Sequence, residues 1–223
     1  MRNSLTPRRS LLIRKWTRWV ETIYSNIVHL ADNRQIFRDT QAVAKSNPRI
    51  NKENAFWEFI LTCYATQASL AVRRQLDRDR RSVSLRLLLE DILKHPHVVT
   101  RRRLQTFLTR YGMPKKHADT LIDKTKKMGR VHISPRAVRN DLARLRKTCG
   151  KIHRFVNKTA AHNSKHRQRS LPTFSDLDLA IDCIESIFKP YLFLVRRNGV
   201  RRFVPVHAED WKWIFDMPWR LKG

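Results

Sequence analysis

The residues best suited to chemistry lie in the run 152–162, which reads IHRFVNKTAAH. Arg154, Lys158 and His162 follow one another at intervals of four, so on a helix their side chains form one ridge. Histidine titrates near neutral pH, while a neighbouring Arg or Lys can hold a phosphate and stabilise developing charge. These groups suffice for metal-independent RNA cleavage, in which the 2′-hydroxyl attacks the phosphorus. The same spacing also fits a histidine that merely caps a basic helix.

The end of this run resembles a known motif. Residues 156–162 read Val-Asn-Lys-Thr-Ala-Ala-His and are similar to the Arg-Asn-Lys-x-x-Ala-His signature of HEPN domains. Five further stretches resemble the AbiU-like branch of that family in order and spacing. They are residues 37–40, 73–75, 84–93, 173–178 and 210–219. The resemblance extends from about residue 20 to the end of the chain.

The resemblance implies an α-helical bundle, often dimeric, whose motif residues cleave RNA without a metal or cofactor. Such proteins act in toxin–antitoxin or phage abortive-infection systems. The implied catalytic residues here are His162, Lys158, Asn157 and Arg154. The motif arginine is missing from its usual place, because Arg154 lies one residue too early, with seven residues between it and His162. Either Lys158 or Arg154 replaces it as the phosphate-binding group, or the site binds RNA without cutting.

The charge of the chain indicates an anionic partner. It has 47 Lys plus Arg against 19 Asp plus Glu, and residues 96–170 hold 21 of the former and only 3 of the latter. Cations that displace counterions from phosphates are the main source of non-specific nucleic-acid affinity, and RNA is the preferred partner. The candidate nucleic-acid-binding residues are Lys147, Lys151, Arg73, Arg74, Arg101, Arg102 and Arg103.

Apolar residues at intervals of three and four, with only five glycines, predict an all-α bundle of about seven to eight helices. We expect one HEPN-like domain over residues 1–223, with a basic helical segment at about 96–135 and an aromatic cap at about 205–220. Predicted helices cover about 11–45, 51–76, 84–94, 100–111, 115–128 and 135–161, and a last long helix follows Thr173. The second helix should bury a stripe that includes Phe56, Phe59 and Cys63. All three cysteines are interpreted as reduced core residues.

Several functions are excluded by missing patterns. The glycine-rich phosphate loops of P-loop and dinucleotide-binding proteins are absent, and so are Cys-x-x-Cys and His-Glu-x-x-His. We therefore expect no metal site and no cofactor. No apolar run approaches the roughly 20 residues that span a bilayer, so we expect no membrane partner and a cytoplasmic location.

Two other functions stay open. The predicted helices at 100–111 and 115–128 could form a DNA-binding helix-turn-helix, with phosphates contacted by Lys115, Lys116, Lys124, Lys126 and Lys127. Alternatively, the charge could meet an acidic protein such as an antitoxin, which would make the chain a non-enzymatic toxin partner.

Overall fold

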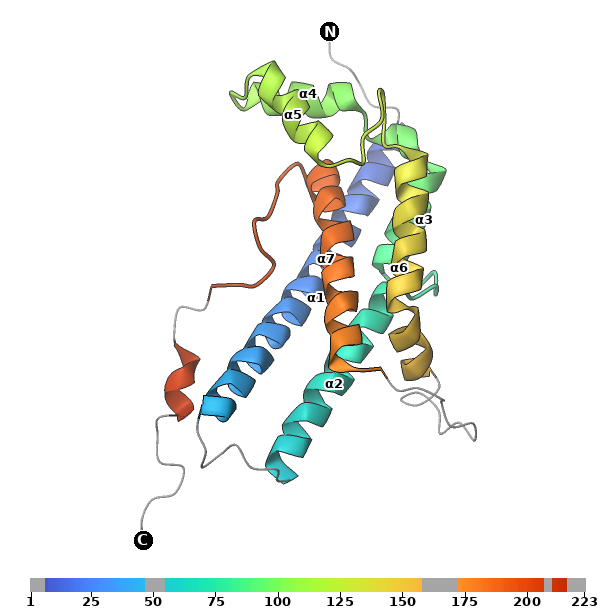
Figure 1. The fold of residues 1–223 in the computed structure, drawn as a ribbon. Coiled ribbons are helices and arrows are strands. Elements are labelled where there is room, and N and C mark those ends of the chain that lie inside the picture. The colour runs from blue at the N-terminus through green and yellow to red at the C-terminus, as the bar shows by residue number, and fades with distance from the viewer. Residues whose placement is uncertain (1–6, 47–54, 158–171, 207–209, 216–223) are drawn as a thin grey trace.

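The computed structural model describes residues 7–46, 55–157, 172–206 and 210–215. Within them lie seven α-helices and two 3-10 turns, and the strand-like pairing is limited to two isolated bridges. The predicted all-α bundle is confirmed. The helices are α1 (Pro7–Ser46), α2 (Ala55–Gln75), α3 (Leu85–Lys94), α4 (Arg101–Arg110), α5 (Lys115–Lys124), α6 (Pro135–Phe155) and α7 (Phe174–Arg196), and the turns are η1 (Pro96–Val98) and η3 (Trp211–Phe215) (Figure 1).

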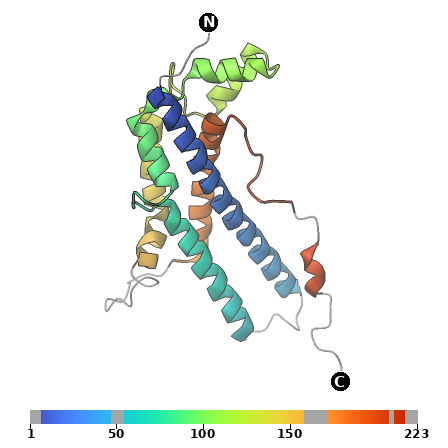
Figure 2. The ribbon, with the colours of Figure 1, turned by 180° about the vertical axis from the view of Figure 1, so that it is seen from behind.

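The long helices form a bundle with α6 and α7 on one face and α1 and α2 on the other. Figure 1 shows the first pair in front, and Figure 2 shows the second pair, with α3 continuing the line of α2. The short helices α4 and α5 lie across the end of the bundle where α1 begins and α7 finishes. The C-terminal end of α6 is at the opposite end.

Helical periodicity builds the core. The apolar face of α6 is buried at Leu142, Leu145, Cys149, Ile152 and Val156. From α1, Trp16, Val20, Ile23 and Ile27 are fully buried, and they join residues of α7 in the same cluster. Burial of each large apolar side chain contributes about 1.5–3 kcal/mol to the free energy of unfolding. The packing of these side chains fixes the position of α6 between α3, α2 and α7.

Local signals set the helix ends as the sequence predicts. The Ser84 hydroxyl accepts a hydrogen bond from the Leu87 amide and caps α3, and Ser134 caps α6 in the same way. Thr173 and Asp176 form a reciprocal capping box at the start of α7. Gly112, with φ of 84°, ends α4.

The predicted core stripe of α2 is wrong for its first half. The buried side of the helix consists of Tyr64, Ala68, Ser69, Val72 and Gln75, whereas Phe59 is 62% exposed and Cys63 is also exposed. The reason is geometric, because the first half of α2 extends beyond α6 and α7 and meets neighbours on one side only (Figure 1).

The described part of the expected aromatic cap is η3. None of its five side chains is fully buried, and it lies beside the end of α1, where Lys212 Nζ is 3.2 Å from Asp39 Oδ2. It therefore packs against the outer side of the end of α1. The other residues of the expected cap include 207–209 and 216–220, which lie outside the described residues.

Candidate nucleic-acid interface

Two residues predicted from separate segments meet at the C-terminal end of α6. Arg73, in the last turn of α2, donates from Nε to Asn157 Oδ1 at 2.6 Å. The backbone there has left regular α-helical spacing, since Val156 and Asn157 adopt a π-helical turn. Such turns are frequent at functional sites. Val72 and Val156, the chain neighbours of Arg73 and Asn157, are both buried, which anchors the backbone on each side of this hydrogen bond.

His153 is the residue that sequence reasoning missed. Asn157 Nδ2 lies 3.5 Å from His153 Nδ1, and because Asn157 Oδ1 already accepts from Arg73, the amide nitrogen faces the imidazole. Burial lowers the pKa of His153, and the positive charges of Arg73 and Arg86 lower it further. The imidazole is therefore neutral near pH 7. The available signal was its position four residues before Asn157, on the same side of the helix.

Arg86 and Arg154 add positive charge near His153, and an ion-pair network extends from Arg86 along α6. Arg86 is buried and its Nε donates to Glu90 Oε1 at 2.9 Å, while Arg146 Nη2 reaches the same oxygen at 3.2 Å. Glu90 thus has two cationic partners, which contribute to lowering its pKa. Arg74 and Arg154 are exposed. The local field at this end of α6 is positive.

One of the predicted nucleic-acid-binding residues on α6 has an acidic partner. Lys151 Nζ lies 2.6 Å from Asp176 Oδ2, so the carboxylate that caps α7 also neutralises this lysine. Lys151 and the hydrogen bonds from Thr173 lower the pKa of Asp176 to about 2. A helical wheel of one helix cannot show a carboxylate that arrives from the next helix. Lys147 remains exposed.

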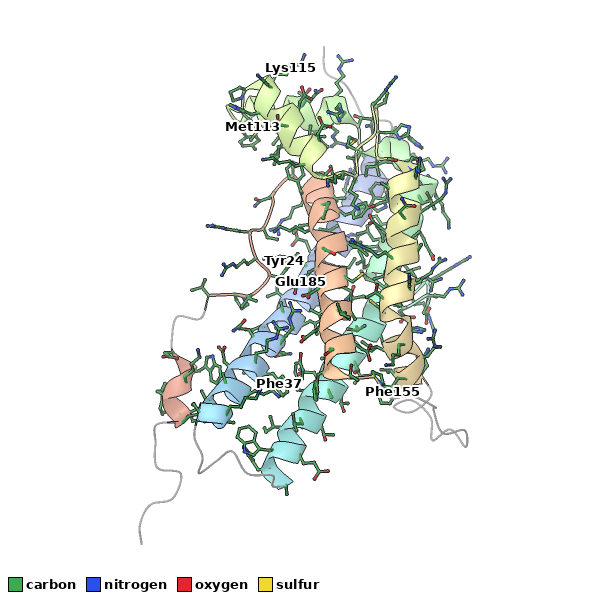
Figure 3. The ribbon with its side chains drawn as sticks, viewed as in Figure 1. Tyr24, Phe37, Met113, Lys115, Phe155 and Glu185 are labelled. Atoms are coloured by element: carbon green, nitrogen blue, oxygen red, sulfur yellow. The ribbon has the colours of Figure 1, made fainter. Side chains whose placement is uncertain are left out.

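The other two predicted catalytic residues, Lys158 and His162, lie outside the described residues. Arg154 and Asn157 are described, at the end where Figure 3 labels Phe155. The structure therefore brings together Asn157, Arg73 and the unpredicted His153.

Two of the family-like segments also meet near this end. Arg38 Nη2 lies 2.9 Å from Asp178 Oδ2, and Phe37 stacks on Phe174 with ring centroids 5.5 Å apart. Asp178 is the main cause of the raised pKa of Arg38. These contacts fasten the C-terminal half of α1 to the start of α7.

The three predicted arginines at the start of α4 have different surroundings, far from Asn157. Arg101 pairs with Asp119 and Asp123 of α5, so its charge is neutralised. Arg102 is exposed. Arg103 is partly buried, and its Nη1 has no hydrogen-bond partner in the described structure. These residues line a second site, at the α4 end of the bundle.

No described helix has the combination of length and apolar character needed to cross a membrane. Among the described residues, His, Cys, Asp and Glu form no group of three or more arranged to hold a metal ion.

Comparison with protein-family models, with curated proteins and with solved structures finds no match for this chain. The resemblance to HEPN domains stays a prediction.

Proposed function

We propose that this chain is an RNA-binding, HEPN-like protein that cleaves RNA without a metal, in a toxin–antitoxin or phage-defence system. The observation that carries the proposal is the 2.6 Å hydrogen bond between Arg73 and Asn157. It joins two segments that the family resemblance singled out independently, and it does so beside a histidine in a positive field.

The chemistry requires a base, an acid and a group that stabilises negative charge on the phosphate. The base removes the proton of the 2′-hydroxyl as the O2′–P bond forms. The acid protonates O5′ as the P–O5′ bond breaks, leaving a cyclic phosphate and a 5′-hydroxyl. His153, neutral near pH 7, suits the base, and His162 is the proposed acid. Arg73, Arg154 and Lys158 are proposed to hold the phosphate.

The electrostatics support RNA binding at this end. Arg73 uses only Nε within the described structure, so its four other N–H donors are free to bind phosphate. Arg154 lies back along α6, with Nη1 3.4 Å from where a Cβ on Gly150 would be. The absence of a side chain at Gly150 gives that guanidinium its space.

The test is degradation of single-stranded RNA by the purified chain in EDTA. We expect cleavage by the wild type, no cleavage by His162→Ala, and resistance of a substrate that carries 2′-deoxyribose throughout. Arg139→Gln is the charge-matched control, because Arg139 is an exposed residue of α6 outside this cluster. Cleavage that survives His162→Ala would overturn the proposed mechanism. RNA binding without cleavage by the wild type would reduce the proposal to binding alone.

Binding of duplex DNA by α4 and α5 is the second candidate. In its favour, the two helices pack together through Arg101 and Asp119, and α5 exposes Lys115, Lys116 and Lys124. Against it, Lys127 does not face solvent, because its Nζ lies 2.6 Å from the buried Asp141. Gel shifts with duplex DNA that depend on sequence and disappear in Lys115→Gln/Lys116→Gln would favour this function over RNA binding.

The expected homodimer and an acidic antitoxin belong to the same proposal. Light scattering on the purified chain should give twice the monomer mass of 26.6 kDa. An acidic protein that co-purifies in a one-to-one ratio and blocks RNA cleavage would identify an antitoxin.

A further inference from the structure

An arginine-lined pocket lies at the opposite end of α6 from the Asn157 cluster. It has a volume of about 780 Å³ and is formed by the start of α1, by α4, by the loop before α6 and by the end of α7. Figure 3 places this end near Lys115, away from Phe155. Seven arginines line it, and no Asp or Glu does.

Six of these arginines keep their charge available. Arg101 is neutralised by α5, but within the described ranges no carboxylate pairs with the rest, which are Arg9, Arg102, Arg103, Arg110, Arg130 and Arg197. Arg9 is oriented by uncharged groups only, since its Nε donates to the Val98 carbonyl at 3.0 Å and its Nη2 to Thr100 Oγ1 at 3.4 Å. Like charges so close together destabilise the fold unless an anion sits among them.

Arg103 is the arginine whose surroundings favour an anionic ligand most strongly. Its buried Nη1 has no hydrogen-bond partner in the described structure. Burial, followed by repulsion from Arg197 and Arg9, lowers its pKa to about 10. A buried polar atom without a partner destabilises the fold, and a charged one does so more strongly. Phosphate oxygens in the pocket would cancel the repulsion that Arg103 feels from Arg197 and Arg9.

Arg197 occupies a conformation that an arginine rarely adopts. It ends α7 with φ of 63°, in the left-handed region, although Gly199 lies only two positions away in the sequence. This conformation brings the Cβ of a non-glycine residue close to the following carbonyl oxygen, and it is therefore strained. Strain of this kind is concentrated at functional sites, and here it places the guanidinium at the pocket, 4.8 Å from the ring centroid of Phe107.

Aromatic rings continue from that guanidinium to the surface. Phe107 lines the pocket, and its ring centroid is 4.7 Å from that of Tyr111, which is 76% exposed. Arg197, Phe107 and Tyr111 thus form a continuous row of contacts beside the charges, with the two rings tilted by 47° to each other. Exposed aromatic rings next to arginines are a common platform for nucleobases.

We propose that this pocket binds the phosphate end of a nucleotide, with the phosphates among Arg9, Arg103 and Arg197 and the base on Tyr111. Six unpaired guanidinium groups suit a ligand with several negative charges, such as a terminal phosphate or a polyphosphate. A phosphodiester within an RNA strand carries only one negative charge. The ligand is either a free nucleotide or the phosphorylated 5′ end of RNA, and both present the same chemistry. The site does not depend on the proposed cleavage at the other end of α6.

The test is calorimetric binding of pyrophosphate, ATP, and a short RNA with either a 5′-phosphate or a 5′-hydroxyl, in about 150 mM salt. We expect pyrophosphate and ATP to bind the wild type and Arg139→Gln alike, and to bind Arg103→Gln at least tenfold more weakly. Tyr111→Ala should weaken the binding of ATP but leave the binding of pyrophosphate unchanged. A preference for the phosphorylated RNA identifies an RNA end as the ligand, and equal binding of the two RNAs identifies a free nucleotide.

The variant Arg197→Gly distinguishes a loss of pyrophosphate binding from a loss of folding. Glycine removes the strain at φ of 63° and one repelling charge, so the fold should be at least as stable as the wild type by thermal melting, while pyrophosphate affinity falls about tenfold or more. The proposal is overturned if pyrophosphate does not bind the wild type, or if Arg139→Gln weakens it as much as Arg103→Gln. If RNA cleavage fails but pyrophosphate binds, this site stands without the proposed function.

Discussion

The Nε of Arg73 and the Oδ1 of Asn157 lie 2.6 Å apart although 84 positions separate them in the chain. This hydrogen bond fixes the end of α2 against the end of α6. A double-mutant cycle with Arg73→Gln and Asn157→Ala should show a coupling of about 0.5–3 kcal/mol in the free energy of unfolding, because contacting residues are not additive. Urea denaturation measures it. Additive effects would show that the two side chains do not interact in solution.

Substitution of Arg73 should weaken RNA binding more than substitution of Arg74. Arg73→Gln removes donors beside Asn157 and His153, and we expect about tenfold weaker binding of single-stranded RNA, the equivalent of one charge-assisted hydrogen bond. Arg74→Gln makes the same charge change on an exposed neighbour and should have a smaller effect. Fluorescence anisotropy at fixed salt compares the two. Equal losses would mean that only the total charge matters.

The stability of the chain should fall on mild acidification because of His153. Its pKa in the folded protein is lowered, by burial and by Arg73 and Arg86, so the unfolded chain binds more protons than the folded one. The free energy of unfolding therefore decreases as the pH falls below the ordinary histidine value of about 6.5, and levels off below the lowered pKa of the folded state. Asp77 opposes this shift and Arg154 adds to it.

The measurement is urea denaturation of the wild type and His153→Gln between pH 7.5 and about pH 5. The glutamine variant should lose stability less steeply, while the other histidines contribute the same background to both. Parallel profiles would show that His153 is not held in its neutral form.

The buried carboxylate of Asp141 should be a major contributor to stability. It accepts a hydrogen bond from Tyr191 Oη at 2.8 Å and pairs with Lys127 Nζ at 2.6 Å. Asp141→Ala leaves the Lys127 charge without its partner and should cost about 3–5 kcal/mol. Tyr191→Phe removes one hydrogen bond to a charged group and should cost about 1.5–3 kcal/mol. A loss below 1 kcal/mol for Asp141→Ala in urea denaturation would contradict the pairing.

Substitution of Ser84, which caps α3, should destabilise the fold less than substitution of Asp141. Ser84 is fully buried, accepts from the Leu87 amide and donates from its hydroxyl to the Asp77 carbonyl at 2.8 Å. Ser84→Ala should therefore cost about 1–2 kcal/mol, at the upper end of the usual range for an N-cap. Ser82→Ala is the control, because the Ser82 hydroxyl is not a helix cap and donates only to an exposed loop carbonyl. Equal effects in thermal melts would argue against the capping role.

Periodicity and cap residues predicted the helices well because both are local. The apolar face of α6 and the caps at Ser84, Ser134 and Thr173 follow from residues a few positions apart. The exposed first half of α2 could not be predicted, because an apolar stripe does not reveal how far the neighbouring helices extend.

The sites were predictable only in part, for a related reason. Basic residues are visible in a sequence, but their pairing partners are not. Lys151 and Arg101 read as free cations and have carboxylate partners from other helices, whereas Arg103 has none in the described structure. The arginine pocket combines four segments from Arg9 to Arg197, so no spacing rule could have shown it.

Helix α6 separates the two candidate sites by a fixed length. Its 21 residues, at about 1.5 Å each, span about 31 Å. A stacked strand that advances about 3.4 Å per nucleotide would cover that distance in about nine nucleotides. If the arginine pocket takes an RNA 5′ end and the Asn157 cluster cuts, α6 would set the distance between the two, and the fragments released would have one preferred size, counted from the end of the RNA.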